Sequence, residues 1–248
     1  MTIAYDGRPY EGWATQPGGN TVQDFLEGAI AEVAKQATRV YGSGRTDTGV
    51  HALGQVAHFD VPDGLSMNAY NWVPAINSKL PATIRVMDCE QVAGDFHARF
   101  SAVEKTYTYD LCLAPVLPPL SAGLAWHLPR QLDPVSLEQA LEILAGEHDF
   151  RAFAAMRGNE TGETNYVRIL RQSGLTISGE GYRITFTGNG FLYKMARLLT
   201  GAAVYCAQGR LRLDDLALLL DQPADLPHGR SPFCAPPDGL SLDHVSYP

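Results

Sequence analysis

The stretch Gly-Arg-Thr-Asp-Thr-Gly-Val-His-Ala, residues Gly44 to Ala52, is the feature around which the rest of the chain is organised. Three glycines, at positions 42, 44 and 49, surround a single Arg-Thr-Asp, and glycine lets the backbone take a positive φ or approach a ligand closely. The pattern predicts a tight turn that presents the carboxylate of Asp47. Arg45, two residues earlier, is expected to lie beside it as a cation that keeps the acid ionised.

An ionised and immobile carboxylate suits nucleophilic attack better than proton donation. The alternative is that Asp47 only ties the turn through a hydrogen bond to nearby backbone, as Asp does in many glycine-rich loops. His51 follows the turn and could be a general base or a neutral structural histidine. The stretch by itself identifies Asp47 as a candidate and leaves its role open.

Composition limits the class of protein. The chain has 248 residues, enough for one large domain or two of ordinary size. No apolar run approaches the ~20 residues needed to span a bilayer, and the N-terminus has no signal-peptide pattern, so a cytoplasmic protein without a membrane partner is expected. The four cysteines form no C-x-x-C pair, which argues against a metal or redox motif. A net charge of −8 argues against non-specific nucleic-acid binding.

Residues 1–103 show the element order β-α-β-β-α-β of a ferredoxin-like unit. Thr21 and Asp24 have the spacing of a capping box at the start of a helix. Gln55 to Val61 alternates in the manner of a strand. The strands are expected at 2–5, near 40, at 55–61 and at 84–92, and the helices at 21–36 and 66–80.

Residues 104–248 repeat this order more loosely. Asp133 followed by Pro134 predicts the start of a helix, and Ser178 to Gly181 predicts the turn of a hairpin. The strands are expected at 105–113, 168–178, 182–188 and 240–247, and the helices at 133–145, 192–208 and 213–221. We therefore predict an α+β fold of two similar halves. The first half carries the Asp47 loop, and the second completes an active-site cleft.

Together these motifs resemble the TruA-type tRNA pseudouridine synthases, whose Gly-Arg-Thr-Asp-x-Gly-Val-His signature carries the catalytic aspartate. An ordered series across both halves is more specific than any one motif. The other matches cover nearly the whole chain: Tyr5-Asp6-Gly7 with Tyr10, Gly12 and Trp13; Thr21-Val22-Gln23; Gln55-Val56 with His58-Phe59; Asn77 with Leu80-Pro81; Asp95 to Ala102 with Lys105, Tyr107 and Tyr109; Phe191, Met195, Arg197 and Gly201; and Gly239-Leu240.

The resemblance implies two RNA-recognition-motif-like halves joined through one extended antiparallel sheet with helices on one face, and a homodimer that binds one tRNA. It implies isomerisation of uridines 38 to 40 in the anticodon stem-loop without a cofactor or metal. At matched positions, Asp47 resembles the nucleophile, Arg45 the arginine that helps to open the stem, and Arg197 the basic partner of the carboxylate. Tyr107 resembles the tyrosine that stacks on the target uracil, and Leu240 an apolar residue of the same pocket.

Each partner also has a structural alternative. Tyr107 and Tyr109 could simply be one packed face of a sheet, whereas Arg197, in a mostly apolar helix, needs a partner if it is buried. Under the RNA hypothesis some of the remaining arginines would line one groove; the candidates are Arg8, Arg39, Arg99, Arg157, Arg168 and Arg171.

Two other classes of function remain open. A non-catalytic tRNA-binding or chaperone protein on the same scaffold would need a basic groove and Tyr107 but not Asp47. A nucleotide-dependent hydrolase would use Gly42-Ser43-Gly44 as a phosphate loop, although no Lys-Ser/Thr follows these glycines.

Overall fold

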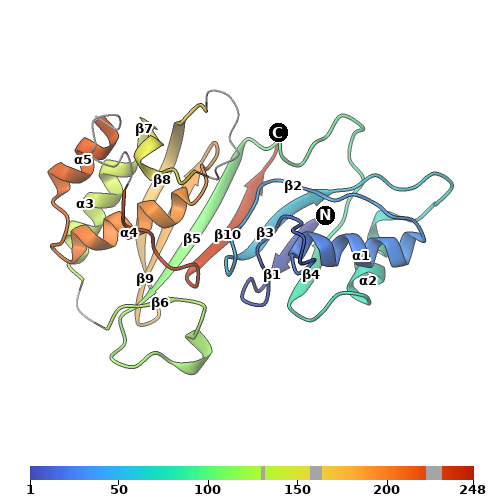
Figure 1. The fold of residues 1–248 in the computed structure, drawn as a ribbon, viewed down its shortest axis with the longest axis horizontal. Helices are drawn as coiled ribbons and strands as arrows, with labels where there is room; N and C mark the ends of the chain where they lie inside the picture. Colours follow the sequence, from blue (N-terminus) through green and yellow to red (C-terminus); the bar gives the residue numbers. More distant parts are fainter. Residues whose placement is uncertain (130–131, 157–163, 222–230) are drawn as a thin grey trace. The chain divides into compact units, whose positions relative to one another are not determined.

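The computed structural model describes residues 1–129, 132–156, 164–221 and 231–248. Within these ranges the protein is α+β, with five α-helices and ten mostly antiparallel strands, which confirms the predicted fold class. Residue contacts divide the chain into two units, residues 1–103 with 241–248 and residues 104–240 (Figure 1). None of the helices in the described ranges is long and apolar enough to cross a membrane.

The first unit is built on a sheet in which β1 lies between β4 and β3. Strand β3 pairs with β1 and also has a neighbour at each of its two ends. Its first residue, His51, is paired in parallel with Ser241 of β10, and its last, His58, is paired with Tyr41 of β2. The strands of this unit are β1 (Thr2–Tyr5), β2 (Tyr41–Gly42), β3 (His51–His58), β4 (Ile84–Asp88) and β10 (Leu240–Ser246).

Two helices complete the core of the first unit. Helix α1 (Val22–Ala34) begins after Thr21 with the predicted Thr21 and Asp24 capping box. Helix α2 (Ala69–Asn77) packs on α1 and β4. Their buried side chains meet the alternating inward residues of the strands, so the sheet and helices share one apolar interior. Its largest members include Ile3, Leu26, Ile30, Trp72, Ile76 and Ile84.

Several predicted boundaries in this unit were wrong. Strand β3 ends at His58 rather than 61, α2 ends at Asn77 rather than 80 and β4 ends at Asp88 rather than 92. Two of the starts also differ. Strand β3 starts at His51 rather than Gln55, because Ala52 pairs with Tyr5 and His51 with Ser241 directly after the turn. Helix α2 starts at Ala69 rather than near Ser66, because the Asn68 side chain accepts the Tyr70 N–H and caps the helix there.

The second unit contains a sheet with the order β5-β9-β8-β7. The predicted hairpin of β8 and β9 is confirmed, with Ser178 opposite Gly181 and Gly179 at a φ of +56° in the turn. Two short strands, β6 and β7, were not predicted, because they form only through pairing with β5 and β8. The strands are β5 (Glu104–Cys112), β6 (Trp126–His127), β7 (Gly146–Asp149), β8 (Val167–Ser178) and β9 (Gly181–Gly188).

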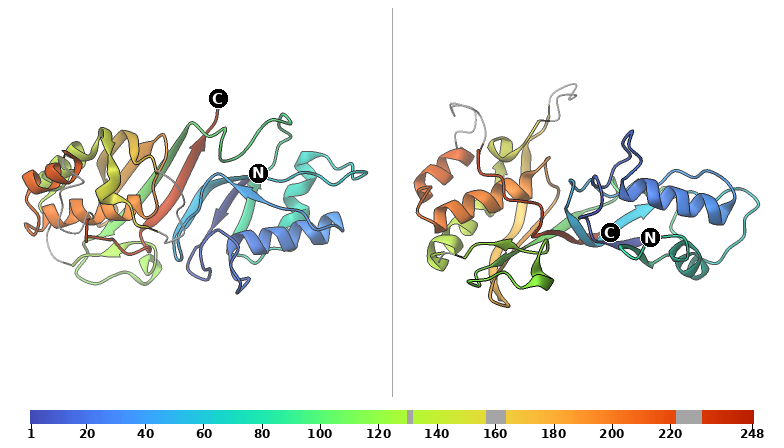
Figure 2. Two further views of the ribbon diagram at one scale, coloured as in Figure 1. Left: turned by 45° about the horizontal axis from the view of Figure 1, so that its top comes forward. Right: turned by 60° about the horizontal axis from the view of Figure 1, so that its bottom comes forward.

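Helix α3 of the second unit packs against both α4 and α5, and Figure 2 shows the three lying together. Helix α3 (Pro134–Leu144) has the predicted Asp133 cap, and α5 (Leu213–Asp221) has the predicted bounds. Helix α4 (Met195–Ala207) starts three residues later than predicted. Lys194 takes a φ of +60°, which lies outside the right-handed helical region, so the helix can begin only after this residue.

Candidate active site

Asp47 lies in the connection from β2 to β3 of the first unit, four residues before His51. The Val50 N–H donates to the Asp47 carbonyl (3.1 Å), and Gly49 has a φ of +80°, which together form the predicted turn. Asp47 is half-buried and Arg45 is exposed. The carboxylate is therefore carried on a defined turn that solvent and a ligand can reach.

The residue before Asp47 is held through both its side chain and its backbone. The Tyr5 hydroxyl is 2.7 Å from Thr46 Oγ1, and the Trp13 N–H donates to the Thr46 carbonyl at 3.1 Å. Burial raises the pKa of Tyr5 well above its ordinary value, so the hydroxyl stays protonated. Gly12 has a φ of +88°, and a Cβ there would lie 2.7 Å from the Thr46 carbonyl oxygen. The Tyr5–Trp13 segment thus fixes one flank of Asp47.

The opposite flank is held by a buried glutamine. The Gln55 side chain accepts the Ser43 hydroxyl at 2.7 Å and donates to the Gly44 carbonyl at 3.0 Å. The Ser43 N–H also donates to the Val56 carbonyl at 2.7 Å. Ser43 and Gln55 are fully buried, so Gly42-Ser43-Gly44 joins the loop to β3. This use of Ser43 argues against the phosphate-loop alternative.

His51 occupies a structural position after the turn. The Gly7 N–H donates to its Nδ1 at 3.2 Å, and only 7% of the residue is exposed. A Cβ at Gly7 would lie 2.1 Å from the Val50 carbonyl oxygen, so the Asp6-Gly7 backbone rests directly on the end of the loop. Arg8 beside Asp6 lowers the pKa of that carboxyl below its ordinary value. The contacts of His51 favour the structural alternative.

The second unit carries the other three candidates. Tyr107 lies on β5 opposite Phe186 of β9 and is 8% exposed. Its ring meets the Phe191 ring at a centroid distance of 4.8 Å and an angle of 70°. Tyr107 is therefore fixed by neighbours on a strand, as both its functional and its structural interpretations require.

Arg197 is anchored to a segment far along the chain. Its Nε donates to the Ala235 carbonyl at 2.8 Å, and the Ala235 N–H donates to the Arg197 carbonyl at 3.0 Å. A Cβ at Gly201, one turn further along α4, would lie 2.1 Å from the Phe233 carbonyl oxygen. The glycine allows residues 233–235 to lie directly on the helix. Arg197 is thus half-buried with a backbone partner.

Tyr109 belongs to the same cluster and was not predicted to have a site role. Its hydroxyl donates to the Pro236 carbonyl at 2.7 Å. Burial raises the pKa of Tyr109 well above its ordinary value, while the charge of Arg197 acts in the opposite direction, which puts the guanidinium in its vicinity. The sequence signals for Tyr109 were its alternation with Tyr107 and its place among the matched motif positions. Neither indicated this contact, which joins residues 127 positions apart.

Leu240 lies beside this cluster at the start of β10. It is 4% exposed, and its N–H donates to the Pro237 carbonyl at 2.9 Å. A Cβ at Gly239 would lie 2.7 Å from the Tyr109 ring, so the glycine lets the segment run against β5. The structure thus places Arg45 and Asp47 on one loop of the first unit, and Arg197 and Leu240 near Tyr109 in the second.

The arginines proposed for an RNA groove have varied environments. Arg168 donates to the carbonyls of Asn165 and Val167, Arg99 lies over a phenylalanine ring, and Arg157 falls outside the described residues. The other three form ion pairs: Arg8 with Asp6 at 2.6 Å, Arg39 with Glu27 at 3.4 Å and Arg171 with Glu104 at 2.9 Å.

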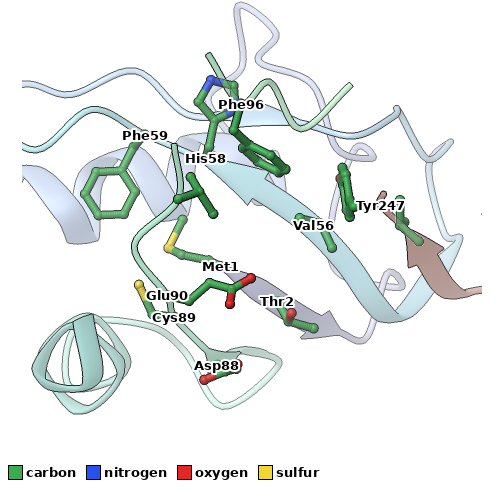
Figure 3. Close-up of a pocket in the computed structure, with 12 residues that line it drawn as sticks. Met1, Thr2, Val56, His58, Phe59, Asp88, Cys89, Glu90, Phe96 and Tyr247 are labelled. Carbon is green, nitrogen blue, oxygen red and sulfur yellow. The ribbon is translucent and has the colours of Figure 1, made fainter. Parts of the chain in front are cut away.

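A pocket of about 240 Å³ lies elsewhere in the first unit (Figure 3). His58 and Phe96 line one part of it, and Asp88 and Glu90 another. Residues 44–52 are not among its lining residues. The described residues contain no group of three or more His, Cys, Asp or Glu side chains that could hold a metal ion.

Sequence comparison places the chain in a family of RNA-modifying enzymes. A family profile described as tRNA pseudouridine synthase matches residues 1–101 and 140–248. The chain belongs to this family and is an isomerase.

Several relatives named tRNA pseudouridine synthase A match the full length of the chain. The protein of Akkermansia muciniphila is 54% identical over 251 residues, which cover 100% of this chain and 94% of the relative. The protein of Burkholderia thailandensis is 41% identical over 252 residues, covering 100% and 89%. The protein of Burkholderia mallei is 40% identical over 252 residues, which cover 100% of this chain and 89% of the relative.

Proposed function

We propose that this protein converts uridine to pseudouridine at positions 38 to 40 of the tRNA anticodon stem-loop, with Asp47 as the nucleophile. The reaction breaks the N1–C1′ bond, turns the uracil, joins C5 to C1′ and moves the C5 proton to N1. Reactant and product are isomers, so no co-reactant is consumed. Asp47 could attack C1′ or C6, or abstract the 2′ proton to give a glycal, and each route uses an ionised carboxylate.

The observation that carries the proposal is the double anchoring of the Asp47 loop. Thr46 is held by Tyr5 and Trp13, and Gly44 by Gln55, while Asp47 itself stays half-buried. A reacting group must be held close to its productive geometry by residues that are themselves fixed. This loop meets that requirement and leaves the carboxylate within reach of a base that has left its stack.

The proposal also assigns a role to each of the other candidates. Arg45 is exposed beside the nucleophile, and we assign it to opening the stem and replacing the extruded base. Arg197 would act as the basic partner that favours the ionised carboxylate. Tyr107 and Leu240, which are nearly buried, would present the aromatic and apolar surface that an extruded uracil requires.

The enzyme is proposed to work in the cytoplasm as a homodimer that binds one tRNA. Sedimentation velocity at working concentration, with and without tRNA, tests the assembly. A dimer is expected, and a protein that stays monomeric under both conditions would contradict this part of the proposal without affecting the chemistry.

Tritium release from unmodified tRNA that carries C5-tritiated uridine tests the reaction. The wild type should release tritium into water without added nucleotide. The C5 hydrogen leaves when C5 bonds to C1′, and the hydrogen on N1 of the product exchanges with solvent. Asp47→Asn keeps the size of the side chain and Asp47→Ala removes it, and both should abolish release while tRNA binding persists. Thr48→Ala alters an exposed neighbour on the same loop and should retain activity.

The two contrary outcomes have different meanings. Wild-type protein that binds tRNA but releases no tritium from any tRNA tested would favour the non-catalytic tRNA-binding function. Release by folded Asp47→Asn and Asp47→Ala proteins would show that Asp47 is a turn residue and that another group performs the reaction.

A further inference from the structure

Four aromatic rings of the first unit form a continuous row, composed of Tyr41, His58, His97 and Phe100. Tyr41 stacks on His58 at a centroid distance of 5.1 Å and an angle of 20°. His58 meets His97 edge-on at 4.7 Å, and His97 meets Phe100 at 4.4 Å. The aromatic row therefore joins β2, the end of β3 and the segment after β4.

The two ends of the aromatic row are exposed to solvent. Tyr41 is 43% exposed and Phe100 is 76% exposed. The Arg99 guanidinium carbon lies 5.6 Å from the centroid of the Phe100 ring. An exposed ring flanked by an arginine differs from a core aromatic, because it leaves both a π surface and a positive charge available to a partner.

Hydrogen bonds hold the histidines of the row in place. The Ala98 N–H donates to His58 Nδ1 at 3.2 Å, and the Arg99 N–H donates to His97 Nδ1 at 3.1 Å. In this arrangement each Nδ1 is an acceptor, so each neutral ring carries its proton on Nε2. The Tyr247 hydroxyl also donates to the Ala98 carbonyl at 2.6 Å. The row is thus a preformed surface.

Burial lowers the pKa of His58 below its ordinary value, and His97 lowers it further. His58 is therefore neutral near pH 7, and its ring can stack on Tyr41 without charge repulsion from His97. His58 also packs edge-on against Phe96, with 6.1 Å between the ring centroids, and Figure 3 shows the two side by side. Packing on several sides therefore holds the ring of His58 in place within the row.

We propose that the aromatic row with Arg99 is a second RNA contact, on which an unpaired base of the tRNA stacks. Proteins recognise unpaired bases by stacking them on aromatic side chains and arginine planes. The row lies at the far end of β3 from the Asp47 loop, and the seven residue steps from His51 to His58 span roughly 23 Å. The base that it binds is therefore a different one from the base that reacts.

This inference rests on the proposed function for the identity of the RNA. A partner protein that docks on the exposed apolar surface is the competing occupant. The two differ in what they require of residue 100, because a base requires a flat π surface whereas a protein contact requires only apolar area.

Three variants of Phe100 separate these possibilities. Phe100→Ala should raise both the tRNA dissociation constant and KM about 5- to 150-fold, the range expected for loss of one stacked base, with kcat at saturating tRNA unchanged. Phe100→Leu should behave like Phe100→Ala, and Phe100→Trp like the wild type. Tyr70→Ala, which removes an aromatic ring 78% exposed on α2, is the matched control and should change nothing.

Filter binding of unmodified tRNA and tritium release give the two readouts. Full affinity in Phe100→Leu, or unchanged affinity and KM in Phe100→Ala, would overturn the proposal. If the wild type released no tritium, the proposed isomerisation would fail. The binding series would still test the RNA contact, so the two failures remain distinguishable.

Discussion

Asp47 in the first unit and Arg197 in the second are positioned by different means. The Asp47 loop is held through the neighbours of Asp47: Thr46 is contacted by the Tyr5 hydroxyl and the Trp13 N–H, and the Gly44 carbonyl accepts from the Gln55 side chain. Arg197 is held by its own side chain, whose Nε donates to the carbonyl of Ala235. Glycines let two pieces of backbone touch in both units, at Gly7 beneath the loop and at Gly201 on α4. The contact in the first unit supports the loop that carries the reacting group, whereas the contact in the second unit supports a segment that accepts a hydrogen bond from Arg197.

The two sites are therefore sensitive to different structural changes. Added bulk at the glycines beneath the Asp47 loop would displace the reacting group itself. Loosening of the 233–236 segment would instead leave helix α4 in place and weaken the hydrogen bond from Arg197 to the Ala235 carbonyl. We therefore expect the same type of substitution to affect catalysis more strongly in the first unit than in the second.

The largest effect is expected for Gly7→Ala. The new Cβ would lie 2.1 Å from the Val50 carbonyl oxygen, so the two backbone segments must move apart, and we expect this to displace the Asp47 loop. A displacement of ~1 Å at a reacting group can reduce the rate on the order of 100-fold, and overpacking costs about 1–3 kcal/mol of stability. Tritium release and thermal unfolding measure the two effects.

The matched control is Gly28→Ala. Gly28 lies in α1, and a Cβ there would meet nothing within 4 Å. Alanine in place of glycine in a helix interior should stabilise the protein by about 1 kcal/mol and leave activity unchanged. Wild-type activity in Gly7→Ala would show that the loop accommodates the shift and that the comparison is wrong for the first unit.

Gly201→Ala applies the same test to the second unit. The Cβ would lie 2.1 Å from the Phe233 carbonyl oxygen and would push residues 233–235 away from α4. We expect stability to fall by about 1–3 kcal/mol and activity to fall less than in Gly7→Ala, because Arg197 can find a new partner. Gly174→Ala on β8, with nothing within 4 Å, is the control. A larger activity loss than in Gly7→Ala would reverse the order of the two units.

Features that depend on neighbours in the chain were predicted well from the sequence. The Thr21 capping box, the Asp133 cap with Pro134 and the β8–β9 hairpin are each specified by a few adjacent residues, and each is confirmed. The turn around Asp47 is confirmed for the same reason, since Gly49 supplies its positive φ. Local signals sufficed where the backbone geometry is local.

Features that depend on distant residues were missed. The early start of β3 comes from pairing with Tyr5 and Ser241, and β6 and β7 exist only through longer partner strands. Likewise, no local pattern could indicate that the Tyr109 hydroxyl reaches Pro236. The roles of Tyr107, Arg197 and Leu240 stay predictions, because they came from matched motif positions.

A smaller effect is expected when one hydroxyl is removed from each unit. Tyr5→Phe deletes the contact to Thr46, and Tyr109→Phe deletes the contact to Pro236. Each should cost about 1 kcal/mol, the usual contribution of a hydrogen bond. Tyr5→Phe should lower kcat a few-fold with KM unchanged, because it loosens the nucleophile loop. Steady-state kinetics on both variants measure the effect. A lower kcat in Tyr109→Phe alone would contradict the expectation that catalysis is more sensitive in the first unit.

The smallest expected effect is a pH dependence of stability in the first unit. The pKa of His58 lies below its ordinary value of 6.5. Burial is the largest cause and the nearby His97 the second. The Met1 ammonium also lowers this pKa, whereas Asp60 raises it. Between the folded and unfolded pKa values the unfolded chain binds more protons. The free energy of unfolding therefore falls as pH drops through 6.5 and levels off below the folded pKa.

NMR titration of the His58 ring should give a midpoint below 6.5 in the folded protein. His58→Gln should show a smaller change in urea midpoint between pH 7.5 and 5.5 than the wild type, because it lacks this proton uptake on unfolding. Histidines elsewhere titrate in both proteins, so the difference between them isolates the contribution of His58. A His58 midpoint at or above 6.5 would mean that packing does not keep the ring neutral, and the aromatic row would then carry charge at neutral pH.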